Sequence, residues 1–258
     1  AGGAWPCSTS PRSLPPSVSG EAAISCDLCA ISFAWDSFSS ASRRGESPGF
    51  MNDTVAMGLT NHLVIFVKTP RLGRVKTRLA AGVGTVAAWT FYRRVLLYQV
   101  KRLTGDRRWR CWLAVTPDGD VDAAPWPGAA SRLAQGTGDL GHRMARIMRA
   151  LPPGPAVIIG TDIPDITPSH VARAFRFLGR HDAVFGPATD GGYWLVGLKR
   201  RPRLPDIFAG VRWSTEFTLS DSLAKLGHGH SVALLEILED IDDGLSLERW
   251  RQKRSARH

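Results

Sequence analysis

The sequence predicts an α/β sandwich with a mostly parallel central sheet, and three observations carry this prediction. From residue 62 onward, short strand patterns alternate with longer helical patterns. The strand patterns are apolar throughout, which is typical of strands that helices cover on both faces. The chain has 258 residues and no visible repeat, which suits one large domain. We therefore expect three layers, with the sheet in the middle.

The first half of the expected domain alternates strands with helices. Residues 62–68 (HLVIFVK) and 110–116 (RCWLAVT) are short apolar runs that predict buried strands. Residues 85–103 have helical spacing. Their common apolar face holds Ala88, Phe91, Val95, Leu96 and Val100. Residues 139–151 predict a further helix, with Asp139 as its N-cap, because a carboxylate can accept from the free N–H groups of a first turn.

The second half continues the alternation. Residues 155–162 (PAVIIGTD) predict a third buried strand that ends in a carboxylate. Residues 167–179 predict a helix that begins at a Thr N-cap followed by Pro and ends at Gly. The remaining expected strands are 182–188, 192–198 and 231–238, of which the last closes the sheet. The remaining expected helices are 215–227 and 243–254.

The two ends of the chain differ in composition from this domain. Residues 1–57 are rich in Ser, Pro and Gly and lack periodicity, which predicts disorder. Met51 and Met57 lie just before the first strand, so we interpret this stretch as an N-terminal extension, or an over-long reading frame, with no role in the fold. The predicted domain is then 58–250, and residues 251–258 form a solvated basic tail.

The charge of the chain favours an anionic partner. The net charge is +10, and residues 1–57 hold three Arg against five acidic residues, so the positive excess lies in the domain. Charge alone does not choose between nucleic acid, phosphorylated small molecules and an acidic membrane surface. No apolar run approaches the roughly 18 residues of a membrane span. The lone Cys26–Cys29 CxxC pattern predicts neither zinc nor a disulfide framework, which favours a cytoplasmic location.

Cations crowd the segment that follows the first strand, FVKTPRLGRVKTRLA. Ligands of open α/β sheets bind beyond the carboxyl ends of the strands, and Lys and Arg form charge-assisted hydrogen bonds with phosphate oxygens. We predict that this segment binds nucleotide phosphates. Its candidate residues are Lys68, Arg71, Gly73, Lys76 and Arg78. The alternative is a solvated basic loop, and the GxxxxGK[ST] pattern of a P-loop is absent.

Acidic residues follow other predicted strands and indicate a metal site. Asp162 is delivered to the sheet edge from a buried strand, and a charge in that position must be paired or bind metal. Asp240 and Asp242 alternate around Ile241, so both face one side of an extended segment. With phosphates nearby, Mg²⁺ or Mn²⁺ is the cation that these oxygens favour. The alternatives are a turn aspartate at 162 and an acidic surface turn at 240–242.

Two further motifs can contact a ligand. Asp190 precedes Gly191 and Gly192, and two glycines beside an acid suit the close passage of a substrate. The alternative there is a hairpin turn. Asp139 and Arg143 lie at the start of a predicted helix, whose N-terminus attracts anions.

Five of these motifs, in order, resemble a bacterial family of GT-A-like transferases of the uncharacterised-domain type. The motifs are KTPRLGRVKTRLA, QGTGDLGHRM, GTDIPDITP, ATDGGYWLVGL and GVRWSTEFTL. Members of that family are described as glycosyltransferases linked to radical-SAM or arsenosugar biosynthesis clusters. The family is distantly similar to the molybdenum-cofactor and phospholactate nucleotidyltransferases. The resemblance covers about residues 62–250.

The resemblance implies a GT-A (Rossmann-like) fold that uses a nucleotide-activated donor and a divalent metal. It implies that Lys76 and Arg78 hold phosphates, that Asp162 is the strong acid of a DxD-like metal site, and that Asp190 lies by the acceptor. We assign Asp162 and Asp190 as catalytic. We assign Gly191, Gly192 and Trp213 as substrate contacts.

Metal-dependent transfer of a glycosyl group from a nucleotide-sugar to a small acceptor is the function that these residues predict. Metal and cations would neutralise charge on the leaving diphosphate. The alternative is nucleotidyl transfer, in which a small phosphorylated substrate attacks an NTP and pyrophosphate leaves. A nucleic-acid-binding module is the third hypothesis. It is weakened because the cations cluster at strand ends without an aromatic-rich recognition motif. The sequence leaves the donor, the acceptor and the oligomeric state open.

Overall fold

The computed structural model describes residues 59–123, 126–128 and 130–256. Residues Val55–His258 cluster as one compact unit, and the description concerns this unit. The other unit, Ala1–Thr54, lies outside the described residues, as do the predicted extension 1–57 and its CxxC pattern.

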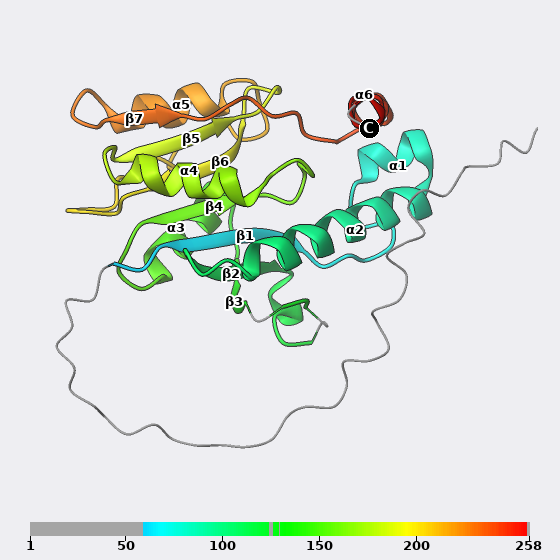
Figure 1. Ribbon diagram of the computed structural model, residues 1–258, viewed down its shortest axis with the longest axis horizontal. Coiled ribbons are helices and arrows are strands. Elements are labelled where there is room, and N and C mark those ends of the chain that lie inside the picture. Colours follow the sequence, from blue (N-terminus) through cyan, green and yellow to red (C-terminus); the bar gives the residue numbers. More distant parts are fainter. Residues whose placement is uncertain (1–58, 124–125, 129, 257–258) are drawn as a thin grey trace, which may run out of the picture. The chain divides into compact units, whose positions relative to one another are not determined.

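A seven-stranded sheet forms the centre of the unit (Figure 1), with strand order β3-β2-β1-β4-β6-β5-β7. The strands are β1 (His62–Lys68), β2 (Arg110–Thr116), β3 (Ser131–Ala134), β4 (Ala156–Ile159), β5 (Ala183–Pro187), β6 (Tyr193–Leu198) and β7 (Val232–Leu234). Strand β6 is antiparallel to both of its neighbours, and all other neighbouring strands are parallel. The predicted mostly parallel sheet is confirmed.

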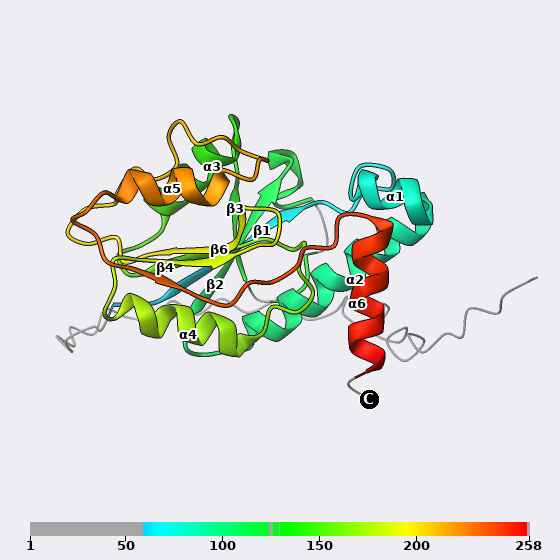
Figure 2. The ribbon, with the colours of Figure 1, turned by 90° about the horizontal axis from the view of Figure 1, so that it is seen from above.

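Helices cover both faces of this sheet, as the sequence predicts. They are α1 (Thr77–Val83), α2 (Thr85–Thr104), α3 (Leu140–Ala150), α4 (Pro168–Leu178), α5 (Thr218–Leu226) and α6 (Gly244–Ser255). Figure 2 shows α2 and α4 on one face and α3 and α5 on the other, with α1 and α6 beside one end of the sheet. Among the helices of the described residues, none has the length and apolar character that a bilayer crossing requires.

The apolar core follows directly from strand alternation. Leu63 and Ile65 of β1 enter the cluster under α2 and α4, whereas Val64 enters the cluster under α3 and α5. A third cluster joins α1, α2 and α6 to the segment before α6, and it contains Leu79, Ala88, Ile241 and Leu247. This third cluster fixes the C-terminal segment beside the loop that follows β1.

Strand β1 lies where the order of the strands reverses. Its neighbours are β2 on one side and β4 on the other, and both pair with it in parallel. Connections leave this point in opposite directions, which opens a crevice beyond the carboxyl ends of the strands. The basic segment after β1 and the carboxylate after β4 therefore reach the same edge.

Several elements differ from their predicted bounds. Helix α1 and strand β3 were not predicted: α1 has no side-chain cap at its start, and β3 is a half-exposed edge strand. The predicted strand 231–238 is regular only over Val232–Leu234, with an isolated bridge at Leu238. Helix α6 runs through Ser255, so residues 251–255 of the predicted basic tail are helical. The predicted N-caps Asp139 and Thr167 are confirmed, each accepting from a backbone N–H of its first turn.

Candidate active site

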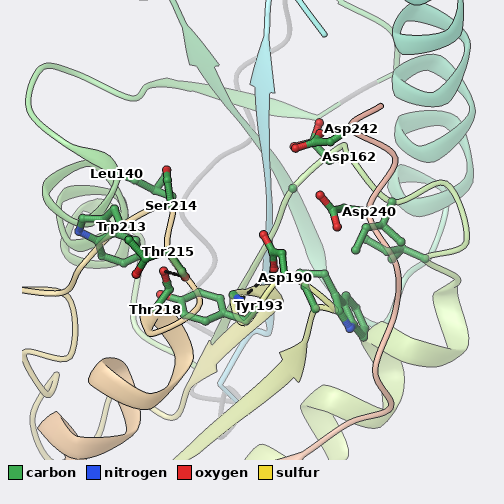
Figure 3. Close-up of a pocket in the computed structure, with 16 residues that line it drawn as sticks. Leu140, Asp162, Asp190, Tyr193, Trp213, Ser214, Thr215, Thr218, Asp240 and Asp242 are labelled. Atoms are coloured by element: carbon green, nitrogen blue, oxygen red, sulfur yellow. Dashed lines mark hydrogen bonds between the residues drawn. The ribbon is translucent and has the colours of Figure 1, made fainter. Parts of the chain in front are cut away.

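Two pockets open at the carboxyl edge of the sheet and meet at Asp162. The first has a volume of about 280 Å³, and we name it the aspartate pocket after Asp162, Asp190, Asp240 and Asp242 in its wall (Figure 3). The second has a volume of about 290 Å³ and lies beyond β1 and β2. We name it the lysine pocket after Lys68 and Lys76, which line it together with Arg74, Tyr92, Gln135 and Asp162. The pair of pockets is large enough for a small-molecule ligand.

Lys76 joins the two pockets. Its Nζ lies 2.6 Å from Asp162 Oδ1 and 2.7 Å from Asp242 Oδ1, and its side chain is only 5% exposed. Burial lowers the pKa of Lys76, but the two carboxylates outweigh that effect and raise its pKa above the ordinary value. The residue has a left-handed backbone, with φ 48°, directly before α1. A non-glycine residue in this region is strained, so its surroundings hold it there.

Backbone hydrogen bonds bring the carboxylates together. The N–H of Ile241 donates to the Asp162 carbonyl at 3.1 Å, and the N–H of Thr189 donates to the Leu238 carbonyl at 3.2 Å. Because Ile241 is buried in the core, its two neighbours, Asp240 and Asp242, turn to the pocket. The predicted common side of these two aspartates is confirmed.

Asp240 carries the clearest electrostatic perturbation of the pocket. Burial, followed by the negative charges of Asp242 and Asp190, raises the pKa of Asp240 to about 6. Like charges held close together disfavour ionisation of one of them. Asp240 is therefore a carboxylate that a cation or a donor-rich ligand would stabilise.

The Asp190–Gly191–Gly192 segment is both a hairpin turn and part of the pocket wall. It connects β5 to the antiparallel β6, and an Asp190 carboxylate oxygen accepts from the Gly192 N–H at 2.9 Å. Asp190 and Gly192 line the aspartate pocket. Gly191 does not line it; its φ is 84°, and a Cβ there would collide with the backbone of Glu216. Packing therefore explains Gly191, which was predicted as a substrate contact.

Trp213 forms the wall opposite the aspartates. Its ring lies edge to face with Tyr193, at a centroid distance of 6.4 Å, and 6.5 Å from the ring of Phe208. A Cβ on Gly141 would lie 2.6 Å from Trp213 Cζ2, so the glycine lets Trp213 approach α3 closely. The hydroxyl-bearing residues Ser214, Thr215 and Thr218 continue this wall.

The predicted phosphate-binding residues of the basic segment separate into two groups. Lys68 and Lys76 line the lysine pocket. Arg78 lines neither pocket; its Nη1 lies 3.5 Å from Asp242 Oδ2, and its side chain is 81% exposed. Arg71 lines neither pocket; its Nη2 instead donates to both carboxylate oxygens of Asp120, at 2.7 and 2.9 Å. Gly73 also lines neither pocket, and its φ of 71° fits a turn.

The structure does not bring the predicted helix-start residues into the site. Asp139 accepts from the backbone N–H and the ring Nδ1 of His142, both at 2.8 Å. Arg143 donates to the Gly138 carbonyl at 2.9 Å. Neither residue lines either pocket. Their contacts are those of a helix cap.

Tyr92 and Gln135 line the lysine pocket although sequence reasoning did not select them. The Tyr92 hydroxyl donates to the Lys68 carbonyl at 2.8 Å and accepts from the Lys68 N–H at 3.0 Å. Gln135 donates to the Ala114 carbonyl at 2.8 Å. A signal was present, because Tyr92 is a polar group within an apolar helical stripe and Gln135 begins the QGTG motif. Both residues fix the ends of the strands that form the pocket.

The donor atoms of the aspartate pocket suit a divalent cation in type. Carboxylate oxygens are the ligands that Mg²⁺ and Mn²⁺ prefer. In the described part of the chain, however, no three His, Cys, Asp or Glu side chains gather closely enough to hold a metal ion. The Lys76 ammonium instead bridges Asp162 and Asp242. The predicted metal ligands thus share one pocket, with a lysine between two of them.

The fold and the two-pocket edge place the chain in a structural class. A 4-diphosphocytidyl-2C-methyl-D-erythritol synthase from Anaerococcus prevotii has the same fold, with a TM-score of 0.50, 10% identity, and coverage of 76% of this chain and 99% of that one. A Desulfovibrio desulfuricans protein described as a "putative nucleotide-diphospho-sugar transferase" matches with a TM-score of 0.66. It is 30% identical and covers 75% of this chain and 87% of its own. The predicted GT-A-like α/β fold is confirmed.

The match to the Desulfovibrio protein shows which family the chain belongs to. The chain belongs to the same family as the Desulfovibrio protein. The model of a bacterial family described as "Uncharacterized protein conserved in bacteria (DUF2064)" matches residues 99–215. No functionally curated protein matches the sequence.

Proposed function

We propose that the protein is a metal-dependent transferase that uses a nucleotide-activated donor and moves a glycosyl group to a small acceptor. One observation supports the proposal: Lys76 of the cationic segment and Asp162, which follows β4, meet at 2.6 Å, where the two pockets join. The Desulfovibrio relative, described as a "putative nucleotide-diphospho-sugar transferase", supports the same class.

In this proposal the lysine pocket holds the nucleotide and the aspartate pocket holds the group that is transferred and its acceptor. Lys76 and Arg78 would bind the diphosphate by charge-assisted hydrogen bonds. Asp162, Asp240 and Asp242 would hold Mg²⁺ or Mn²⁺. The ion would neutralise charge on the leaving diphosphate.

Asp190 is the proposed general base. Its hydrogen bond with the Gly192 N–H fixes its carboxylate at the pocket wall. An acceptor hydroxyl would give its proton to Asp190 while its oxygen bonds to the anomeric carbon. The bond from that carbon to the diphosphate breaks, and the nucleoside diphosphate leaves with the bonding electrons.

Nucleotidyl transfer is the second candidate, because the cations beside Asp162 would also suit a nucleoside triphosphate. Incubation with Mg²⁺ or Mn²⁺ and separate panels of NTPs and nucleotide-sugars distinguishes the two reactions. Acceptor-dependent release of nucleoside diphosphate supports glycosyl transfer, whereas pyrophosphate release supports nucleotidyl transfer. The link to radical-SAM or arsenosugar clusters stays a prediction.

The variant Asp162→Asn tests the central residue. We expect it to abolish turnover with little change in melting temperature, because the Asp162 side chain is 55% exposed. Asp165→Asn is the matched control: this carboxylate lies three positions on, accepts from Trp250 Nε1 at 3.2 Å and lines neither pocket. Full turnover by Asp162→Asn, or equal loss in both variants, contradicts the role of Asp162.

A further inference from the structure

We propose that the aspartate pocket selects a neutral or cationic, hydroxyl-rich ring and rejects anionic ones. This inference rests on the proposed function, in which the nucleotide occupies the lysine pocket, and it names the substrate class of the adjoining pocket. A phosphorylated or carboxylated acceptor is thereby excluded.

The first argument for this selectivity is the charge of the residues around the pocket. Asp162, Asp190, Asp240 and Asp242 line the pocket, and its lining contains no Lys, Arg or His. Lys76 bridges Asp162 and Asp242 from the lysine pocket. Among the described residues, neither Asp190 nor Asp240 forms an ion pair. The four carboxylates carry −4, and Lys76 (+1) together with one divalent ion (+2) leaves −1, so an anionic ligand would face net negative charge with or without the metal.

The hydrogen-bonding capacity of the pocket carries the second step. Ionised carboxylates only accept hydrogen bonds. On the opposite wall, the Thr215 and Thr218 hydroxyls already donate to the Arg212 carbonyl, at 2.8 and 2.9 Å. The Thr215 oxygen also accepts from the Phe217 N–H at 3.3 Å, so one of its lone pairs is used and the other can accept from a ligand. The Trp194 indole N–H likewise donates to the Glu236 carbonyl at 3.2 Å. The carboxylates and the threonine oxygens thus accept, whereas the Ser214 and Tyr193 hydroxyls of the lining can donate or accept. The matching ligand is therefore rich in hydroxyl groups, with donors facing the carboxylates.

The aromatic wall carries the third step. Figure 3 shows Trp213 and the hydroxyl-bearing residues across the pocket from Asp162 and Asp240. The apolar C–H face of a sugar-like ring can pack on Trp213 while its hydroxyls reach the carboxylates. A phosphate or carboxylate brings acceptors and negative charge to walls that already present both. The substrate class that fits is a polyol ring, with or without an amino group.

Three ring probes of matched shape test this inference. Methyl α-glucoside is neutral, glucosamine is cationic and glucuronate is anionic. Binding of each is followed by tryptophan fluorescence and by ligand-observed saturation-transfer NMR. We expect the first two to bind in the millimolar range and glucuronate to bind at least about tenfold more weakly. Trp213→Ala should abolish ring binding, and the double variant Asp190→Asn/Asp240→Asn should restore glucuronate binding to within about twofold of the neutral probe.

A matched control separates local from general charge effects. Asp106→Asn removes the same charge near the start of β2, at the opposite edge of the sheet, where Asp106 pairs with Arg108. It should leave the tenfold discrimination unchanged. Equal binding of glucuronate and methyl α-glucoside by the wild-type protein overturns the inference. So does glucuronate binding that only Asp106→Asn restores.

The same titrations distinguish this inference from the proposed function. UDP, GDP, ADP, CDP and dTDP are titrated in parallel with Mn²⁺. If a nucleoside diphosphate binds and none of the three rings does, the ring assignment is overturned and the nucleotide site stands. If the rings bind as expected and none of the five nucleotides does, the proposed function is overturned and the selectivity of the pocket stands.

Discussion

At the residue scale, Lys76 determines how the carboxylates of the site are paired when no ligand is bound. Its ammonium bridges Asp162 and Asp242 and takes the position of a cation between them. A nucleotide diphosphate would compete for the same ammonium and release the carboxylates. Metal binding should therefore depend on the nucleotide.

The variant Lys76→Met tests this dependence through metal affinity alone. We predict that Mn²⁺ binds weakly to the nucleotide-free wild-type protein and about tenfold more tightly to Lys76→Met, because two carboxylates lose their competing cation. The free Mn²⁺ signal in electron paramagnetic resonance measures this directly. Lys68→Met is the control: it removes the same charge in the lysine pocket, and among the described residues Lys68 pairs with neither aspartate. Equal Mn²⁺ affinity in all three proteins contradicts the prediction.

From the raised pKa of Asp240 we expect the stability of the fold to depend on pH. Its pKa in the folded chain is about 6, against about 3.9 when unfolded, so the folded state holds more protons between these values. The free energy of unfolding should then decrease as the pH rises from about 4 to about 6. Above about pH 6, Asp240 should cause no further decrease.

The variant Asp240→Asn should remove this fall. At pH 7 we expect a gain of about 1 kcal/mol after discounting for partial exposure, or about 2–4 °C in melting temperature. Melting curves of both proteins across this pH range provide the test. If both proteins lose the same stability between pH 4 and pH 7, the prediction is contradicted. That result would show that the charge of Asp240 is already compensated in the folded chain.

At the scale of elements, the sequence predicted the strands more accurately than the contacts between loops. Strands β1 and β2 have their predicted bounds because a continuous apolar run is a local signal of burial. Helix α1 has no such signal, since a left-handed Lys76 stands where a capping side chain would. The pairing of Asp240 and Asp242 was predictable from alternation. The pairing of Arg71 with Asp120, which lies 49 residues away, was not, because it depends on the tertiary approach of two loops.

The contact between α3 and Trp213 gives a prediction at the same scale. Gly141→Ala places a methyl group 2.6 Å from Trp213 and from the Phe208 carbonyl. We expect Trp213 to shift, with a loss of about 1–3 kcal/mol in stability and weaker ring binding. Gly229→Ala is the control, since a Cβ there meets nothing within 4 Å. Melting temperature and ring binding read out both variants, and identical behaviour of the two would contradict the packing argument.

At the scale of the whole molecule, the lysine pocket and the aspartate pocket lie at the same edge of the sheet. Residues after β1, β4, β5 and β7 converge there although they are far apart in the chain. The parallel pairing of β1 with β2 and β4 dictates this, and the sequence could predict it only through the fold class. The identity of the ligand is set by side-chain contacts between distant segments, which is why the sequence left it open.

The strands of the sheet and the residues named in its three apolar clusters all lie after residue 61, in the part of the chain that the structure describes. We therefore predict that a chain beginning at Met57 folds cooperatively and keeps its nucleotide affinity within about twofold of the full chain. Circular dichroism melting and nucleotide titration check this. A failure to fold would mean that residues 1–56 take part in the core.

The central claim is that the cationic segment after β1 and the carboxylate after β4 bind one nucleotide–metal complex. Calorimetric titration of the five nucleoside diphosphates, with and without Mn²⁺, into wild-type protein and Asp162→Asn tests it most directly. We expect at least one nucleotide to bind the wild-type protein at least about tenfold more tightly with Mn²⁺, and Asp162→Asn to lose this enhancement. Equal affinities with and without Mn²⁺ in both proteins, or no nucleotide binding in either, would contradict it.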